Sequence, residues 1–255
     1  MSKLPTGKQF LDVSDYGRPA AKAIVRVLAP TPVSSLHLTY AFLLVGCAAI
    51  ISTANGYHVY AAILLVCKSV LDAADGEMAR FRKQPSQTGR YLDSIFDYLI
   101  NFGLLYVIYA TSGASLVIFI AAFVSIEFQG TIFSYYYLVQ RAALQGDTTS
   151  VVNEFEKRPA LPGDTPAVVN VLRKIYLLLY GPYDWLMLKL DPRAADGIIL
   201  PNVFLSVVSF FGLGFQLLVI GILMVAGQVD LVLPFFVWLN ILAFVLVFGR
   251  RILMR

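Results

Sequence analysis

The sequence predicts an all-α integral membrane protein with six transmembrane helices and an interfacial amphipathic helix at its N-terminus. Of the 255 residues, 58% are hydrophobic and 14% are charged, whereas about a quarter of the residues are charged in soluble domains. Apolar stretches long enough to cross a bilayer recur along the chain. The basic residues gather in the connections on one side of these stretches, which is typical of a protein that crosses the membrane several times.

The first 34 residues are expected to form a segment at the membrane surface. Apolar side chains are interspersed there with Arg18, Lys22 and Arg26, a pattern typical of an amphipathic helix on an anionic lipid surface. The remaining residues, 35–255, are expected to form one six-helix transmembrane domain, because no part of them is long enough to fold separately.

Apolar runs and the turn residues between them place the six spans. Pro30 and Pro32 precede the first span, and a turn at 55–56 ends it. The polar and then mixed composition of residues 142–198 predicts a cytoplasmic loop that is followed by an interfacial helix. The expected spans are about 35–52, 57–81, 89–111, 115–139, 201–226 and 231–248.

The distribution of basic residues predicts the orientation in the cell membrane. Every Lys and Arg except Lys68 lies near a terminus, between the fourth and fifth spans, or at the junction of the second and third. The opposite connections, 52–58, 111–114 and 227–230, contain none. By the positive-inside rule, both termini and the junction of spans two and three are expected to face the cytoplasm.

Four aspartates flank that junction at fixed offsets. On helices, Asp72 and Asp75 fall on one stripe, and Asp93 and Asp97 lie one turn apart on another. Both pairs meet at the same membrane face, so the four carboxylates can face each other. The full pattern is Asp72-x2-Asp75-Gly76-x2-Ala79-Arg80, eight residues, then Gly89-x3-Asp93-x3-Asp97.

Carboxylates beside the membrane interior need compensation, because unpaired charge there costs several kcal/mol. A pair of divalent cations would provide it. Oxygen ligands suit Mg²⁺ or Mn²⁺, and no His or Cys nearby indicates zinc. We therefore expect a metal site on Asp72, Asp75 and Asp93, with Asp97 close enough to complete it.

The spacing D-x2-D-G-x2-A-R-x8-G-x3-D-x3-D resembles the signature of the CDP-alcohol phosphatidyltransferase family, and every signature position is filled. The resemblance implies transfer of a substituted phosphate from a CDP-linked donor to an alcohol, with release of CMP, by a homodimer. The favoured reaction moves a phosphatidyl group from CDP-diacylglycerol to a polar alcohol and forms a phospholipid. The alternative is a soluble CDP-alcohol that gives its phospho-alcohol to diacylglycerol or to an inositol phosphate. Membrane lipids are expected partners, and nucleic acids are not.

The resemblance also implies roles for the signature residues. The family assigns its last aspartate as the general base, which carries over to Asp97, and the spacing leaves a ligand role open for the same residue. Gly76 and Ala79 lack bulk, so they would let the nucleotide approach the backbone, although small residues also pack helices together. Arg80 offers a donor fork to the diphosphate, and Gly89 gives the third span an uncrowded start. Asp75 completes the expected nucleotide site.

Three residues outside the signature are candidates for binding the acceptor. Lys68, one turn before Asp72, could contact a substrate phosphate or form an ion pair with Asp72. Glu127 is an acid in mid-span, where ionisable residues often mark functional sites. Arg141 could hold an acceptor phosphate, although positive-inside topology also explains it. A phosphorylated acceptor would be favoured if Arg141 or the basic group at 157–174 lined the site.

A cation transporter is the alternative of a different class, because acids in a membrane would also bind a transported ion. It does not explain why the acids cluster at one cytoplasmic end. It also does not explain the offsets of Gly76, Ala79 and Arg80.

Overall fold

The computed structural model describes Leu4, Gly7 and residues 9–144, 151–156, 159–196 and 198–253. Throughout this part of the chain the secondary structure is helical, as the sequence predicts. The α-helices are α1 (Arg18–Leu28), α2 (Ser35–Ala54), α3 (His58–Phe81), α4 (Gln87–Ser112), α5 (Leu116–Ala143), α6 (Pro166–Leu179), α7 (Gly181–Leu190), α8 (Asn202–Val208), α9 (Leu213–Val225) and α10 (Val232–Leu253). Short 3₁₀ turns are η1 (Val13–Asp15), η2 (Pro192–Asp196), η3 (Ser209–Phe211) and η4 (Val229–Leu231).

Serine caps begin three of the long helices. The side chains of Ser34, Ser86 and Ser115 each accept a hydrogen bond from a backbone N–H in the first turn of α2, α4 and α5. Such caps satisfy donors that a helix start otherwise leaves unpaired. Gly113 ends α4 in the left-handed conformation, with φ of 68°, which glycine adopts without steric cost.

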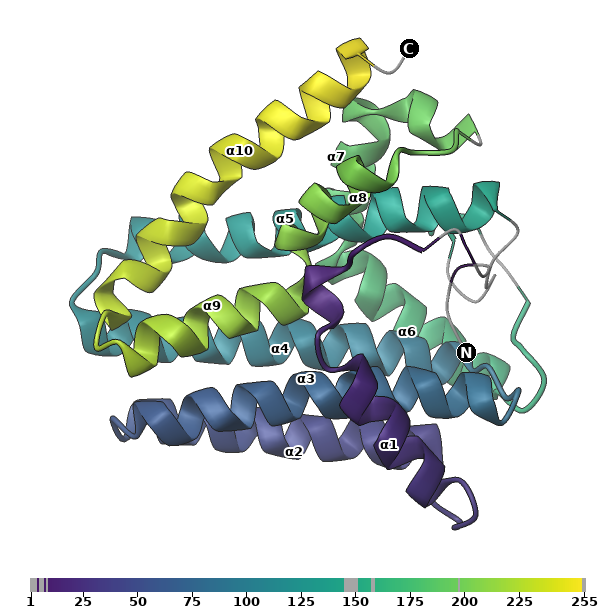
Figure 1. The fold of residues 1–255 in the computed structure, drawn as a ribbon, viewed down its shortest axis with the longest axis horizontal. Coiled ribbons are helices and arrows are strands. Elements are labelled where there is room, and N and C mark those ends of the chain that lie inside the picture. The colour runs from purple at the N-terminus through teal and green to yellow at the C-terminus, as the bar shows by residue number, and fades with distance from the viewer. Residues whose placement is uncertain are drawn as a thin grey trace.

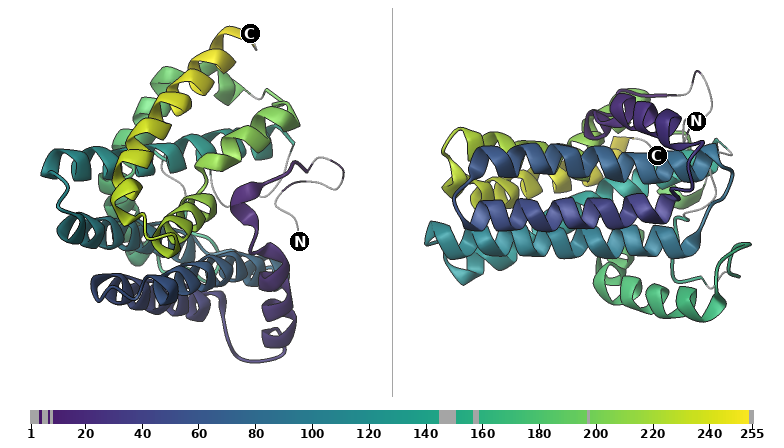
Figure 2. Two further views of the ribbon diagram at one scale, coloured as in Figure 1. Left: turned by 60° about the vertical axis from the view of Figure 1, so that its left-hand side comes forward. Right: turned by 90° about the horizontal axis from the view of Figure 1, so that it is seen from below.

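The helices α2, α3, α4 and α5 lie roughly side by side, whereas α10 crosses them at an angle (Figures 1 and 2). Helix α2 packs against both α3 and α4. On the other side, α9 packs against α3, and α10 packs against α5. A large apolar core joins α2, α3, α4, α5, α9 and α10 in the half of the bundle away from the signature. A second core joins α5, α7, α8 and α10.

The number of candidate membrane spans is lower than predicted. Within the described residues, α2, α4, α5 and the stretch Val229–Ile252 are long and apolar enough to cross a membrane. The pair Asn202–Phe211 and Leu213–Val225 adds a fifth span if its two bent parts count as one. The expected second span forms one helix, α3, but Lys68 and the signature acids lower its apolar character. Six spans are therefore not confirmed and stay a prediction.

The expected span 201–226 is not one straight helix. It is broken at Gly212, where α9 bends by 49° from the preceding helix. The N-terminal segment fills the break, because the backbone N–H of Val13 donates to the Ser209 hydroxyl over 3.0 Å. A Cβ at Gly214 would lie 1.9 Å from the carbonyl oxygen of Ser14. The glycines thus admit a chain segment that the sequence alone did not place there.

Gly214→Ala should therefore destabilise the protein, by about 1–3 kcal/mol, since an added methyl group must displace backbone rather than a flexible side chain. Thermal unfolding in detergent measures the effect. Gly249→Ala is the matched control: nothing lies within 4 Å of its added Cβ, and alanine is favoured over glycine in a helix by about 0.5–1 kcal/mol. Equal behaviour of the two variants would contradict the close contact with Ser14.

Two expected surface helices differ in detail from their predictions. The N-terminal helix is confined to α1, and η1 lies before it in the bundle. The mixed segment after residue 165 forms two helices, α6 and α7, rather than one. Along α6, Val168, Val171 and Leu178 are exposed, which fits a helix that rests on apolar lipid.

Candidate active site

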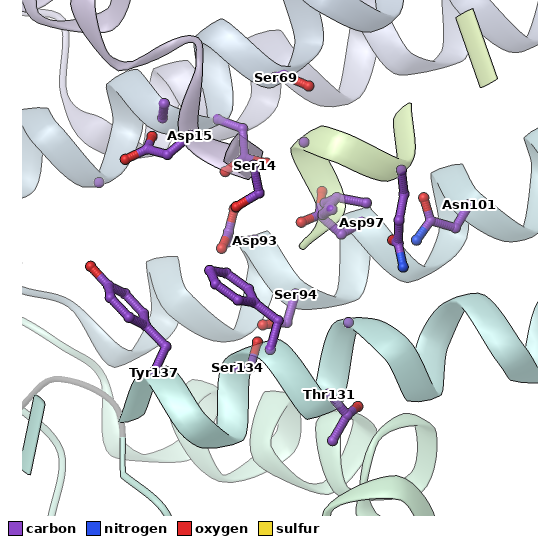
Figure 3. Close-up of a pocket in the computed structure, with 18 of the residues that line it drawn as sticks. Ser14, Asp15, Ser69, Asp93, Ser94, Asp97, Asn101, Thr131, Ser134 and Tyr137 are labelled. Atoms are coloured by element: carbon purple, nitrogen blue, oxygen red, sulfur yellow. The ribbon is translucent and has the colours of Figure 1, made fainter. Parts of the chain in front are cut away.

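A cavity of about 340 Å³ opens at the signature end of the bundle. It is lined by the N-terminal segment, α3, α4, α5, α6, α7 and the start of α9. Ser14 and Asp15 border it from one side and Ser134 and Tyr137 of α5 from the other (Figure 3). The cavity therefore collects polar side chains from segments that are far apart in the sequence.

Three of the four signature aspartates converge in this cavity. One carboxylate oxygen each from Asp72, Asp75 and Asp93 lies within 4.8 Å of the other two. We call these three residues the acidic cluster. Because α2 packs against both α3 and α4, it holds the two halves of the signature in register. From α2, the hydroxyl of Thr39 donates to the Asp75 carboxylate over 2.7 Å.

The acidic cluster fits a divalent cation. Within the described residues, Oδ1 of Asp93 is buried and has no hydrogen-bond partner. Such an atom is costly unless something compensates it. Carboxylate oxygens at this spacing are the donor set that Mg²⁺ and Mn²⁺ prefer.

Asp97 also lines the cavity but is not one of the acidic cluster, and it forms an ion pair with Lys68. The Lys68 ammonium also donates to Asp72 over 2.7 Å and lies 4.7 Å from the centre of the Phe42 ring. The Lys68 side chain is fully buried and does not line the cavity. Of the two interpretations of Lys68 from the sequence, the structure has the ion pair and not a group exposed to substrate.

The other predicted site residues divide into two groups. Gly76, Arg80 and Glu127 line the cavity. Ala79, Gly89 and Arg141 are not part of its lining. Arg141 is buried in the last turn of α5, and the N–H of Gly89 is engaged by the capping hydroxyl of Ser86. Residues 157 and 158, part of the predicted basic group, lie outside the described residues.

The comparisons with known proteins now bear on this geometry. The sequence model of the CDP-alcohol phosphatidyltransferase family matches residues 30–180, which is more than half of the chain. The chain belongs to this family. No curated protein and no solved structure matches it. The members of the CDP-alcohol phosphatidyltransferase family are transferases that move a phosphatidyl or phospho-alcohol group from a CDP-alcohol, and they use a divalent metal.

Part of this transferase cavity comes from residues that the sequence analysis missed. Asp12, Ser14, Asp15 and Arg18 reach it from outside the region that the family model matches. Arg18 forms ion pairs with Asp15 and Glu77. The short spacing of Asp15 and Arg18 was visible in the sequence, but the contact with α3 spans 59 residues and no local pattern indicates it.

Glu77 of α3 is a salt-bridged acid outside the acidic cluster. Its carboxylate lies 3.1 Å from Arg80 and 3.4 Å from Arg18. Glu77 therefore joins the start of α1 to the signature helix α3.

Helices α6 and α7 add Tyr176, Tyr180 and Asp184 to the cavity of this transferase. The hydroxyl of Tyr180 donates to the carbonyl of Ser94 over 3.1 Å and so fixes α6 on α4. Tyr176 donates to the Asp184 carboxylate over 3.1 Å. Burial raises the pKa of Asp184 to about 7, since a desolvated carboxyl favours its neutral form.

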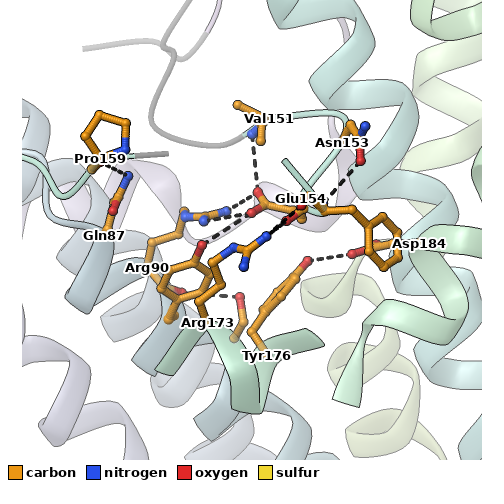
Figure 4. A network of polar contacts seen from close by, with 12 residues as sticks. Gln87, Arg90, Val151, Asn153, Glu154, Pro159, Arg173, Tyr176 and Asp184 are labelled. Atoms are coloured by element: carbon orange, nitrogen blue, oxygen red, sulfur yellow. Dashed lines mark hydrogen bonds and ion pairs between the residues drawn. The ribbon is translucent and has the colours of Figure 1, made fainter. Parts of the chain in front are cut away.

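The loop before α6, which includes residues 151–156 and 159–165, contacts the second half of the signature through polar side chains (Figure 4). Glu154 forms a two-pronged ion pair with Arg90, three residues before Asp93. Arg173 of α6 donates to the carbonyls of Glu154 and Phe155 over 2.9 and 2.8 Å. Such paired donors fix geometry as well as charge. The loop thus holds the α4 turn that carries Asp93.

Asp164 of the same loop contacts the start of α4. Its carboxylate accepts hydrogen bonds from the Ser86 hydroxyl and from the backbone N–H groups of Gln87 and Thr88, over 2.7, 2.7 and 3.3 Å. A negative charge is also favoured at a helix N-terminus. The loop therefore replaces water at the first turn of the helix that bears two signature aspartates.

Asp164→Ala should lower the free energy of unfolding by about 1 kcal/mol, the usual effect of losing a helix cap. Turnover should fall by about 10-fold or more, since small displacements of catalytic groups are costly. Glu156→Ala, which removes an exposed acid of the same loop, should change neither value. Full activity of Asp164→Ala would contradict a positioning role for the loop.

Proposed function

We propose that the protein is a membrane phosphatidyltransferase that moves a phosphatidyl group from CDP-diacylglycerol to a polar alcohol and releases CMP. The observation that carries this proposal beyond family membership is an apolar groove of about 560 Å³ between α3 and α9. Val66 and Cys67 line it on α3, and Leu217 and Leu218 line it on α9.

The groove begins where the cavity ends along the same two helices. Ser69 and Asp72 of α3 and Gln216 of α9 line the cavity. The groove continues from there along the outer surface of the same two helices, away from the signature. A lipid whose headgroup reaches the acidic cluster would lay an acyl chain in the groove. A water-soluble donor with a water-soluble acceptor would leave the groove without use.

The proposed reaction is a displacement at phosphorus. The acceptor oxygen forms a bond to the phosphorus that carries diacylglycerol, and the bond from this phosphorus to the oxygen that bridges to CMP breaks. CMP leaves with that oxygen and its electron pair, and the acceptor proton passes to Asp97, the proposed general base. Asp97 fits this role because Lys68 fixes its carboxylate one helical turn from Asp93.

The proposed ligands of Mg²⁺ or Mn²⁺ are Asp72, Asp75 and Asp93, and Asp97 would complete the site for a second ion. When bound, the ions would neutralise the charge of the diphosphate. Arg80 lines the cavity beside Gly76 and is proposed to bind a diphosphate oxygen. Gly76 and Ala79 have small side chains, and we propose that the cytidine approaches the α3 backbone at these two residues. Gly89, the last residue of the proposed nucleotide site, would keep the start of α4 uncrowded.

Filling the groove should weaken the use of the lipid selectively. Leu218→Trp should raise the KM for CDP-diacylglycerol about 10-fold, the effect of losing contacts of about two methylene groups. CMP binding in the presence of Mg²⁺ should stay unchanged. Ile241→Trp, on an exposed position of α10, is the matched control and should keep the wild-type KM. An unchanged KM in Leu218→Trp would remove the groove from the lipid site.

The positions of basic residues support a cytoplasmic active site, because the cavity lies at the end of the bundle where those residues gather. The family resemblance supports a homodimer. Modification of single cysteines added at 84 and at 228 by an impermeant reagent tests the orientation in spheroplasts. Mass measurement of the detergent-solubilised protein tests the dimer.

Acceptor-dependent release of CMP tests the function. Purified protein with Mg²⁺ and CDP-diacylglycerol should release CMP when a suitable alcohol is added. If no alcohol supports CMP release from CDP-diacylglycerol, but a soluble CDP-alcohol is turned over with diacylglycerol, then the lipid is the acceptor and not the donor. The groove would also accommodate a lipid acceptor. A cation transporter would gain no thermal stability from CDP or CMP with Mg²⁺, whereas the transferase should.

A further inference from the structure

Beyond Asp97, the cavity continues into a polar cluster that the proposed chemistry has not used. Asn101 lies one turn after Asp97 on α4, and its amide donates to the Glu127 carboxylate of α5 over 2.9 Å. Both side chains line the cavity although they are only 5% and 3% exposed. Tyr180 is an electrostatic neighbour of both Glu127 and Asp97. The cluster therefore starts about 6 Å along the helix from the proposed base.

Glu127 has hydrogen-bond partners but no counter-charge. Asn101 donates to its Oε1, and the Tyr180 side chain is a second hydrogen-bond partner. No ion pair of Glu127 occurs within the part of the chain that the structure describes. A buried carboxylate is costly unless donors or a cation compensate it. A bound molecule with a hydroxyl or ammonium group would add to this compensation from the cavity.

The charges around the cavity argue against a phosphate at this end. Among its described lining residues, the cations are Arg18 and Arg80, and both are ion-paired with Glu77 at the α1 and α3 side. Arg141 does not line the cavity, and Arg173 is engaged with the carbonyls of the loop. A phosphate beside Glu127 would meet a second anion in a poorly solvated site, where repulsion is strong.

We infer that Asn101 and Glu127 bind the acceptor, and that the acceptor is a small alcohol without a phosphate group that carries a further hydroxyl or ammonium donor. The inference rests on the proposed function, because it assigns the second substrate of the same cavity. One hydroxyl faces Asp97 and becomes the attacking oxygen, whose proton Asp97 accepts. The further donor binds the Glu127 carboxylate one turn deeper.

Matched acceptor pairs test this inference in the purified full-length protein with CDP-diacylglycerol and Mg²⁺. Glycerol is compared with glycerol 3-phosphate, and inositol with inositol 1-phosphate, while ethanolamine and serine represent amino alcohols. An unphosphorylated alcohol should support CMP release at least 10-fold better, by kcat/KM, than any phosphorylated one. Preference for a phosphorylated acceptor would overturn the inference and leave the proposed function standing.

Variants test the residues. Glu127→Gln and Asn101→Ala should each raise the acceptor KM about 10-fold, the effect of losing one hydrogen bond to a charged group, with the KM for CDP-diacylglycerol unchanged. Glu156→Gln makes the same chemical change at an exposed position and should resemble the wild type. Two folded variants with wild-type acceptor KM, or an equal rise in both KM values, would overturn the assignment.

Binding without turnover separates this inference from the proposed function. With CMP and Mg²⁺ present, an unphosphorylated alcohol from the panel should raise the Tm of the wild type and not that of Glu127→Gln. If no acceptor releases CMP from CDP-diacylglycerol, the proposed function fails. The Tm shift then still tests the subsite, and its absence with every alcohol would overturn the inference.

Discussion

Asp93→Asn should abolish CMP release, with a loss of at least about 100-fold, because the variant removes a charged carboxylate from the proposed metal site. It should also melt at a higher temperature than the wild type in EDTA. Oδ1 of Asp93 is buried without a hydrogen-bond partner among the described residues, and it lies near two other carboxylates. Removing one of three like charges that lie close together relieves repulsion.

Mg²⁺ should reverse this order of stability. In the wild type, saturating Mg²⁺ should raise the Tm by several degrees, since a ligand that binds only the folded state stabilises it. The Asp93→Asn variant should gain little. Asp230→Asn, at an exposed acid in η4, is the control and should match the wild type in both conditions. An Asp93→Asn variant that Mg²⁺ stabilises fully would remove Asp93 from the metal site.

The sequence could predict that the aspartates of the acidic cluster come together, because their placement depends on local spacing. A spacing of three residues puts Asp72 and Asp75 on one face of a helix, and a spacing of four does the same for Asp93 and Asp97, wherever those helices begin and end. The helices themselves follow from apolar runs and from serine caps such as Ser86. Their meeting in one cavity required only that both halves lie at the same membrane face.

The remaining features depend on contacts between distant segments, which no local pattern encodes. Gly212 and Gly214 read as ordinary glycines of an apolar span until η1 is seen to pack against them. In the sequence, Asp164 is an ordinary acid in a loop. In the structure it caps α4 by accepting a hydrogen bond from the N–H of Gln87, which is 77 residues away. The bend at Gly212 within the span expected over 201–226 could not be predicted for this reason.

Lys68 shows the same limit within the signature region. Its spacing to Asp72 left an ion pair and a substrate contact open, and the sequence could not show that Asp97, 29 residues away, is a second partner. One buried ammonium therefore compensates one carboxylate from each half of the signature. Within the acidic cluster, Asp72 has this lysine partner, whereas Asp75 and Asp93 have no ion pair among the described residues.

Lys68→Met should consequently act on stability in the opposite direction to Asp93→Asn. Removing the ammonium leaves Asp72 and Asp97 without their counter-charge, and breaking a buried ion pair from one side costs about 3–5 kcal/mol. The variant should melt well below the wild type in EDTA and gain more from Mg²⁺ than the wild type does. Its kcat should fall, since the carboxylate of the proposed base is no longer held in place.

The double variant Lys68→Met with Asp97→Asn separates stability from catalysis. It removes both partners of one ion pair, so most of the stability lost in Lys68→Met should return, while CMP release stays absent because the base is missing. If Lys68→Met alone kept the wild-type Tm in EDTA, the ammonium would not be the counter-charge of these aspartates. If the double variant regained turnover, Asp97 would not be the base. The two measurements therefore test the charge balance of the site and the role of Asp97 independently.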